Sequence, residues 1–122
     1  MTKGRILVVD DDDVLCETLA EVLEMEGYTV QTAGDGVRAL YLTTQTPPNL
    51  VLLDMRMPVL DGWGFMQEMR KWGLDVPVLL MTASEDMAYA ADVFSPDGFV
   101  GKPFQLDELL PAIERLCAPT AA

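Results

Sequence analysis

Four polar groups in this chain, each placed directly after a short apolar segment, could together carry out phosphate chemistry. They combine carboxylates, a hydroxyl and an ammonium, an inventory that suits a phosphoryl group and a divalent cation. If the apolar segments are parallel strands, these groups meet, because the carboxyl ends of such strands share one edge of the sheet and ligands bind there. The groups are the acidic run Asp10–Asp13, Asp54, Thr82 and Lys102.

Carboxylates gathered at one edge of a sheet need an offsetting charge. We expect Asp10, Asp11 and Asp54 to lie within a few ångströms of each other. Two like charges about 4 Å apart repel by roughly 4 kcal/mol at an effective dielectric constant of about 20. Protonation, the Lys102 ammonium and a bound cation are the candidates for the offset. Carboxylate oxygens without histidine or cysteine nearby select Mg²⁺, Mn²⁺ or Ca²⁺, and Mg²⁺ fits this inventory best.

Asp54 is the expected nucleophile, because it alone ends the most apolar segment, which should be the central strand. Transfer to a carboxylate needs positioning and charge neutralisation more than a general base. Lys102 suits one phosphoryl oxygen as a point charge, and Thr82 with a backbone N–H near Ala83 could hydrogen-bond another. Simpler interpretations stay open: a solvated surface lysine, an ordinary strand-end threonine, and an acidic run that caps the next helix, which is favoured for Asp12 or Asp13.

Strand and helix patterns alternate along the whole chain. Strands are expected at 5–10, 28–32, 50–54, 76–82 and 99–100, and helices at 14–25, after the cap Asp35, from the Asp61-Gly62 turn to about Trp72, at 86–94, and from about 106 to 116. This order predicts an α/β domain with helices on both faces of a parallel sheet. Right-handed crossovers favour a three-layer, flavodoxin-like (βα)5 fold with strand order 2-1-3-4-5.

Apolar periodicity predicts which side chains the helices bury. Pro111 is expected to kink the last helix or to delay its start, because it removes a backbone hydrogen bond. The inward-facing residues are Leu15, Leu19, Val22 and Leu23 in the first helix, Val37, Leu40 and Tyr41 in the second, Phe65, Met66, Met69 and finally Trp72 in the third, and Leu106, Leu109, Leu110, Ile113 and Leu116 in the last.

Composition excludes several classes of function. The 122 residues suffice for one domain, and 8 basic against 20 acidic side chains give a net charge of −12, which argues against nucleic acids and anionic membranes. No apolar run approaches the roughly 20 residues of a spanning helix, and no signal-peptide pattern begins the chain. Cys16 and Cys117 are expected to be buried free thiols in a reducing cytoplasm. The absence of histidine excludes a histidine-assisted nucleophile, histidine-ligated zinc and a phosphohistidine on this chain.

Five segments, in this order and with suitable spacing, together resemble the receiver domain of two-component response regulators. The resemblance spans about residues 4–117 of a single domain over 1–122. It implies a phosphorylation-activated switch that takes a phosphoryl group from a histidine kinase or phosphotransfer protein in a Mg²⁺-dependent reaction. It further implies control of a downstream protein or a covalently linked output domain, rather than enzymatic turnover of other substrates. The segments are Val8–Asp12, Leu52–Pro58, Asp61-Gly62, Met81–Ala83 and Lys102–Phe104.

The resemblance also implies roles for individual residues. A metal-holding group comprises Asp11, Asp54, the main-chain carbonyl of Arg56 and, through water, Asp10. A second group receives the phosphoryl group and responds to it: Asp54 as phosphoacceptor, the salt-bridging Lys102, the switch hydroxyl of Thr82, the main-chain N–H of Ala83, and Phe99 at an aromatic switch position where tyrosine is common.

Two other functions fit parts of the sequence. A constitutive interaction module would have lost phosphate chemistry, although every residue needed for it is present here. A phosphohydrolase of the haloacid dehalogenase type also uses a strand-end aspartate, but it needs a second aspartate two residues later, where this chain has Arg56. Mg²⁺ binding would discriminate against the first, and multiple turnover of a simple phosphomonoester would favour the second.

Overall fold

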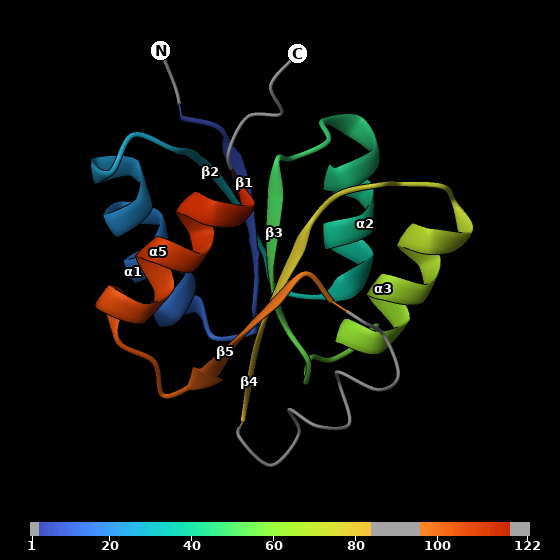
Figure 1. The fold of residues 1–122 in the computed structure, drawn as a ribbon. Coiled ribbons are helices and arrows are strands. Elements are labelled where there is room, and N and C mark those ends of the chain that lie inside the picture. Colours follow the sequence, from blue (N-terminus) through green and yellow to red (C-terminus); the bar gives the residue numbers. More distant parts are fainter. Residues whose placement is uncertain (1–2, 84–95, 118–122) are drawn as a thin grey trace.

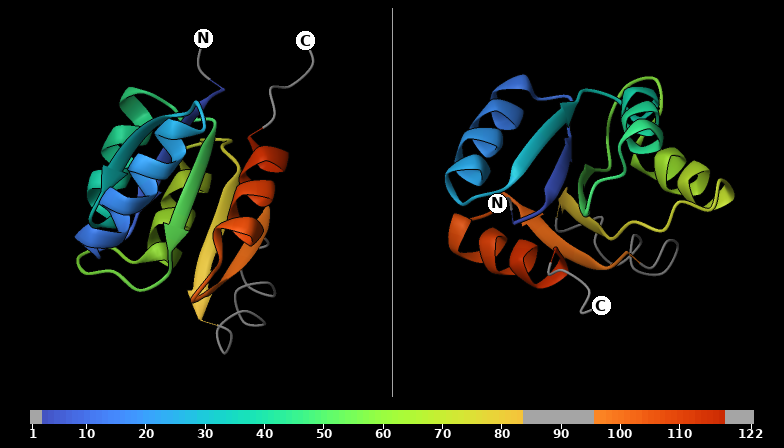
Figure 2. Two further views of the ribbon diagram at one scale, coloured as in Figure 1. Left: turned by 90° about the vertical axis from the view of Figure 1, so that its left-hand side faces the viewer. Right: turned by 90° about the horizontal axis from the view of Figure 1, so that it is seen from above.

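A computed structural model describes residues 3–83 and 96–117 of the chain. The five strands form one parallel sheet in the order β2-β1-β3-β4-β5, so the expected strand order is confirmed. Helices α1 and α5 cover one face of the sheet, and α2 and α3 cover the other (Figures 1 and 2). The elements are β1 (Arg5–Val9), α1 (Asp13–Met25), β2 (Thr29–Ala33), α2 (Gly36–Gln45), β3 (Leu50–Asp54), α3 (Gly62–Lys71), β4 (Val78–Ala83), β5 (Gly98–Lys102) and α5 (Leu106–Leu116).

The predicted central position of β3 and edge position of β2 are both confirmed. All five residues of β3 are buried, whereas β2 is mostly exposed or half-buried. A continuous apolar run is typical of a strand covered on both faces, and mixed polarity is typical of an edge. The helix expected at 86–94, with the surface that it would form, lies outside the described residues. No helix among the described residues is long and apolar enough to cross a membrane.

Two hydrophobic clusters fill the spaces between the sheet and its helical layers. Successive strand residues point to opposite faces of a sheet, so each inner strand contributes to both clusters. In β1, Leu7 and Val9 join the cluster under α2 and α3, and Ile6 and Val8 join the cluster under α1 and α5. The same alternation continues to the ends of the strands, where it determines which polar side chains can meet.

Helix α2 does not bury the side chains that the apolar pattern predicted. Leu40 is buried, but Val37 and Tyr41 are 53% and 54% exposed, so the inward orientation expected for them is wrong. The buried face instead carries the small residues Gly36 and Ala39, together with Thr43. Small side chains let α2 approach α3 and the loop that precedes it closely, so bulk was a poor guide to the buried face.

Smaller corrections apply to the helix ends. Trp72, the C-cap of α3, is 54% exposed, and Leu106, the first residue of α5, is 44% exposed. The burial expected for these two side chains is therefore wrong. Side chains at a helix end extend past the covered part of the sheet. A late start of α5 is also wrong, because the helix begins five residues before Pro111 and continues through it.

Candidate functional site

Strand register brings Asp10, Asp54 and Lys102 to one end of the sheet and to one of its faces. In the pairing of β1 with β3, Val9 lies opposite Leu53, so Asp10 and Asp54 follow at the next level. Residues two apart in a strand point to the same face of the sheet. Asp10, Asp54 and Lys102 each lie two residues after a member of the cluster under α1 and α5, and these members are Val8, Leu52 and Val100. The sequence prediction that these groups meet at the carboxyl ends of the strands is therefore confirmed.

Lys102 bridges two of the aspartates. Its Nζ lies 2.8 Å from Oδ2 of Asp10 and 3.2 Å from Oδ1 of Asp54. Asp10 is only 1% exposed, whereas the Lys102 side chain is 31% exposed, so the ammonium covers the carboxylates from the solvent side. The interpretation of Lys102 as a solvated surface lysine is wrong. The ammonium supplies part of the charge compensation that the sequence required.

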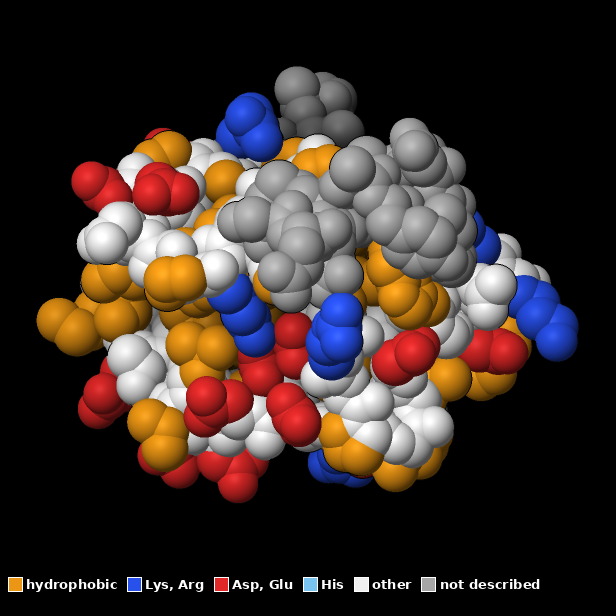
Figure 3. All heavy atoms as spheres, turned by 90° about the horizontal axis from the view of Figure 1, so that it is seen from below, with side chains coloured by type: hydrophobic (Ala, Val, Ile, Leu, Met, Phe, Trp, Pro, Cys, Tyr) orange, Lys and Arg blue, Asp and Glu red, His pale blue; other side chains and the backbone are white. Residues whose placement is uncertain are grey.

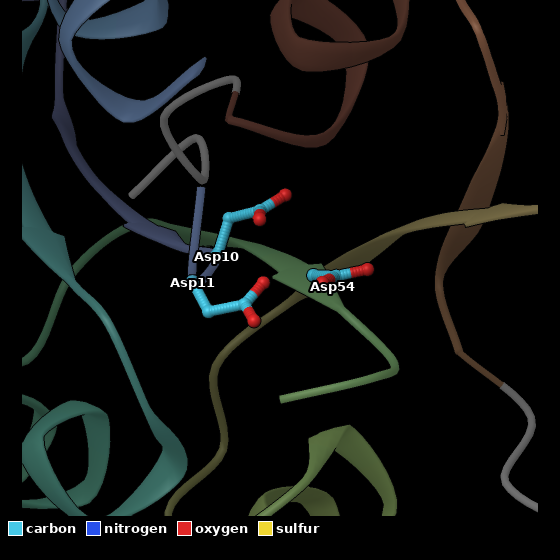
Figure 4. Close-up of side chains that lie close together, drawn as sticks. All are labelled: Asp10, Asp11 and Asp54. Atoms are coloured by element: carbon cyan, nitrogen blue, oxygen red, sulfur yellow. The ribbon is translucent and has the colours of Figure 1, made fainter. Parts of the chain in front are cut away.

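Asp11 completes a cluster of three carboxylates. One oxygen from each of Asp10, Asp11 and Asp54 lies within 4.8 Å of the others, and Asp11 is the exposed member. Figure 4 shows the three side chains side by side at the ends of β1 and β3. In Figure 3, which views this end of the molecule, acidic side chains gather near the middle of the face beside basic ones. The cluster is thus reachable from solvent on the Asp11 side.

The cluster changes the protonation behaviour of its members. Burial and the charge of Asp10 raise the pKa of Asp54, although the Lys102 ammonium and a hydrogen bond from the Arg56 backbone act against them. For Lys102, burial lowers the pKa, but the hydrogen bond to Asp10 and the charges of Asp54 and Asp10 outweigh it, so the pKa is raised overall. The ammonium therefore stays charged at neutral pH, while negative charge is less favoured on Asp54 than on a solvated aspartate.

Asp54 and Lys102 also line a pocket of about 260 Å³, together with Met55, Arg56, Thr82 and Ala83. Thr82 is 2% exposed, and its hydroxyl donates to the carbonyl of Ala83 at 3.3 Å, a long hydrogen bond. The Thr82 hydroxyl can readily give up such a weak hydrogen bond and donate to a better acceptor. Thr82 and Ala83 thus lie beside the carboxylate and the ammonium, where the sequence expected them.

Phe99 lies on the opposite face of the sheet from Lys102. It is partly buried and packs against the cluster under α2 and α3, consistent with its parity one residue before Val100 of the other cluster. Its register partner is Leu80 on β4, two residues before Thr82. From this position Phe99 is two residues along the sheet from the level of Thr82. That Phe99 acts as a switch stays a prediction.

Arg56 and Asp11 line a second, larger pocket of about 640 Å³ next to the carboxylates. The loop between β3 and α3 forms most of its wall, including Met57 and Pro58, and Trp63 in the first turn of α3 adds to it. The loop ends at Asp61, whose carboxylate accepts the backbone N–H of Gly64 at 2.9 Å and caps α3. This pocket brings Asp11 and Arg56 to one solvent-accessible hollow beside the carboxylates.

Asp12 has a structural role, as the sequence favoured. It is the N-cap of α1, and its carboxylate accepts the backbone N–H of Leu15 at 3.1 Å. Its own N–H donates to Oδ1 of Asp10 at 2.9 Å, which ties the start of the helix to the site. The run of four aspartates is thus divided: Asp10 and Asp11 join the carboxylate cluster, and Asp12 caps the helix.

Replacing Asp12 by alanine should lower the free energy of unfolding by about 1 kcal/mol, because the N-cap hydrogen bond is lost. Replacing it by asparagine, an equally good cap, should leave stability nearly unchanged. Urea denaturation of the two variants measures this. Equal losses in both would mean that the charge of Asp12, and not its cap, is what stabilises the protein.

The sequence did not predict the contact of Cys16 with the site. Both cysteines are buried free thiols, as expected. The Cys16 thiol donates to the backbone carbonyl of Asp10 at 3.3 Å, and burial with the charge of Asp10 raises its pKa to about 11. The thiol is therefore unreactive and helps to fix the backbone that carries Asp10. Cys16 is one turn into α1, and only the turn geometry brings it back to Asp10.

The residues present fit a divalent cation. The cluster supplies carboxylate oxygens alone, and Arg56 lines the adjoining pocket. Oxygen ligands of this kind suit hard divalent cations such as Mg²⁺ and Mn²⁺. Lys102 contacts Asp10 and Asp54, and Asp11 is the exposed carboxylate of the cluster.

The raised pKa of Asp54 predicts a pH dependence of stability in metal-free protein. Its contribution to stability is fully present below the ordinary carboxyl pKa of 3.8 and is lost as the pH rises through the higher folded-state value. An Asp54→Asn protein lacks this loss. The difference in unfolding free energy, variant minus wild type, should therefore increase from pH 3.8 towards neutrality, as measured by urea denaturation with EDTA. A difference that does not change with pH would contradict the assignment.

Comparisons with known proteins agree with this geometry. Residues 6–114 match the family model described as response regulator receiver domain. A protein named response regulator MprA from Mycobacterium sp. (strain KMS) is 40% identical over 119 residues, which cover 96% of this chain and 52% of that protein. The chain thus spans about half the length of the mycobacterial relatives that it matches.

Solved structures give the same result. The receiver domain of the Francisella response regulator 1452 superimposes with a TM-score of 0.86 at 28% identity, covering 93% of this chain and 96% of that one. The non-phosphorylated HemR receiver domain from Leptospira biflexa gives a TM-score of 0.83 at 34% identity, with 97% of each chain covered.

Proposed function

This chain belongs to the response regulator receiver domains, a family of phosphorylation-activated switches, and we propose that Asp54 is the residue that accepts the phosphoryl group. The observation that carries the proposal is the bridge from Lys102 to Asp10 and Asp54 at the open end of the sheet. This bridge joins the ends of β1 and β3, which carry Asp10 and Asp54, to the end of β5. A carboxylate nucleophile, a fixed cation and a hydroxyl donor then surround one pocket.

Asp11, Asp54 and the Arg56 carbonyl would hold Mg²⁺ or Mn²⁺ directly, and Asp10 would hold its waters. When bound, the cation neutralises charge on the carboxylates and on the phosphoryl oxygens. A carboxylate oxygen of Asp54 attacks phosphorus, and the bond from phosphorus to the donor's leaving group breaks, so that the bonding electrons leave with the donor. Lys102 pairs with one phosphoryl oxygen, and the N–H of Ala83 donates to another.

The acyl phosphate would draw the Thr82 hydroxyl away from its long bond to the Ala83 carbonyl. A shorter, charge-assisted hydrogen bond to a phosphoryl oxygen replaces it, which shifts the equilibrium between two arrangements of β4 and β5. Phe99, whose register partner Leu80 lies two residues before Thr82, follows this shift and changes the exposed surface. The modification thus acts through packing on a surface that a partner can read.

The donor would be a histidine kinase or a phosphotransfer protein, and the receiver of the signal a downstream protein or a linked output domain. Support comes from the relatives, which carry the name response regulator and are about twice as long as this chain. A net charge of −12 makes direct nucleic-acid binding by this domain unfavourable. We place the protein in the cytoplasm, where its buried thiols remain reduced.

Incubation with acetyl phosphate and Mg²⁺ tests the proposal. Mass spectrometry should find one added phosphoryl group, and EDTA should prevent the addition. Calorimetry should detect heat when Mg²⁺ is titrated into the protein. If the protein gains no phosphoryl group and Mg²⁺ gives no heat, a constitutive interaction module is favoured. Sustained turnover of a simple phosphomonoester would favour a phosphohydrolase.

A further inference from the structure

The loop between β3 and α3 is closed on itself and contains Arg56, whose carbonyl is the proposed backbone ligand of the metal. The N–H of Gly62 donates to the carbonyl of Met55 at 3.0 Å, which joins the two ends of the loop. Arg56 is the first residue within this closure, and Leu60 lies near its other end. Because a short closed loop moves as a unit, the position of the Arg56 carbonyl depends on how the far end of the loop is held.

The far end of the loop contains a strained turn. The N–H of Leu60 donates to the carbonyl of Pro58 at 2.8 Å, and Val59 between them has a φ of 69°. A hydrogen bond over three residues with positive φ at the centre is the rare and strained form of the γ-turn. Val59 is β-branched and 82% exposed, so its own side chain gains nothing from this conformation. Such a conformation persists only where neighbouring contacts impose it.

Leu60 supplies those contacts by lying between two glycines on neighbouring helices. Its carbonyl accepts the N–H of Gly36 at 2.9 Å, and Gly36 is the first residue of α2, whose N–H has no partner within the helix. A Cβ at Gly36 would overlap this carbonyl oxygen, and a Cβ at Gly64 would overlap Cδ1 of Leu60. The main chain of α2 and the first turn of α3 therefore hold Leu60 from two sides (Figure 1 shows both helices on one face).

We propose that Leu60 is a positioning residue for the metal site, held between Gly36 and Gly64 so that the loop presents the Arg56 carbonyl beside Asp11. The inference depends on the proposed function, because it assigns the Arg56 carbonyl as a metal ligand. It also gives α2 a role in the site: the N–H of Gly36, its first residue, fixes the loop between β3 and α3. Displacing Leu60 should therefore weaken metal binding without removing any metal ligand.

The decisive variant is Gly36→Ala, whose new methyl group pushes the Leu60 carbonyl away. Titration calorimetry with Mg²⁺ should give an affinity about tenfold lower than that of the wild type, the effect expected when the support of a metal ligand is lost. Gly34→Ala is the matched control, since a Cβ at Gly34 meets nothing within 4 Å and should leave the affinity unchanged. Leu60→Ala, which empties the space between the glycines, should weaken binding in the same direction and decides the matter if Gly36→Ala does not fold.

A purely structural role of Leu60 predicts a different result. Ile113→Val loosens the core on the other face of the sheet, and its Mg²⁺ affinity should equal that of the wild type despite its lower melting temperature. Wild-type affinity in folded Gly36→Ala or Leu60→Ala overturns the inference, as does a loss of affinity in Ile113→Val. Failure of the unmodified protein to bind Mg²⁺ overturns the proposed function itself, a result distinguishable from failure of the variants alone.

Discussion

An Asp54→Asn protein should gain no phosphoryl group from acetyl phosphate and Mg²⁺ under conditions that modify the wild type completely. The amide has the shape of the carboxylate but lacks a nucleophilic oxygen, so the acyl phosphate cannot form. The pocket should stay intact, because Asp54 lies in a fully buried strand and its Oδ1 can still accept from Lys102. Intact-mass spectrometry after rapid quenching measures the loss, which should be complete.

The same change at an exposed carboxylate provides the control. Asp75 lies in the connection between α3 and β4, outside the pocket, and Asp75→Asn should be modified like the wild type. A phosphoryl group on Asp54→Asn at wild-type yield would show that another side chain accepts it, and Asp11 would then be the next acceptor to examine. Calorimetry on Asp54→Asn adds an independent measurement, since the loss of one proposed ligand should weaken Mg²⁺ binding.

Much of the site could be predicted because the signal lies in strand ends. Each of Asp10, Asp54 and Thr82 directly follows an apolar run, and parallel strands bring such positions together whatever the details of the helices. Lys102 is less obvious from the residues alone. It ends a five-residue strand, of which only Phe99 and Val100 were expected, and its pairing with Asp10 becomes clear once the register of β5 against β4 is known.

Helix α2 shows where sequence reasoning was insufficient. Periodicity gave the helix and its cap at Asp35, which accepts the N–H of Arg38, but it selected Val37 and Tyr41 for burial. The pattern of bulky residues and the pattern of small ones are both helical, and they lie on different faces. Which face is buried depends on how closely the neighbouring loop approaches, and this is a long-range property of Leu60 and Gly36. A local hydrophobic period carries no information on that distance.

The division of the acidic run depends on the three-dimensional structure for a similar reason. Four consecutive aspartates offer the same chemistry, and only the turn after β1 separates them. Asp10 continues the strand into the core and is 1% exposed, Asp11 is exposed beside the pocket, and Asp12 turns back to cap α1. The general rule that a helix start favours acidic residues anticipated the role of Asp12, but not where the boundary falls.

A Lys102→Met protein should separate metal binding from phosphoryl transfer. Methionine keeps an unbranched apolar stem of similar length but removes the ammonium that contacts Asp10 and Asp54. Mg²⁺ should still bind, and more tightly, because Lys102 no longer competes for the carboxylates. The rate of phosphorylation by acetyl phosphate should fall about 100-fold, which is the usual cost of losing one preorganised charge at a developing oxyanion. Lys71→Met, on the exposed surface of α3, is the matched control and should react at the wild-type rate.

Stability should respond to the Lys102 change in a way that metal reverses. Without Mg²⁺, Asp10 stays almost fully buried beside Asp54 with no ammonium, so the free energy of unfolding should fall by about 2 kcal/mol, less than for a fully enclosed pair since Lys102 is 31% exposed. Saturating Mg²⁺ supplies the missing positive charge and should restore most of this loss, as thermal melts with and without the metal would measure. Slow phosphorylation in a protein that Mg²⁺ has restabilised would assign Lys102 to the transferred group itself, because neither misfolding nor loss of metal could then account for the rate. An unchanged rate in Lys102→Met would instead confine the ammonium to balancing the charge of the resting carboxylates.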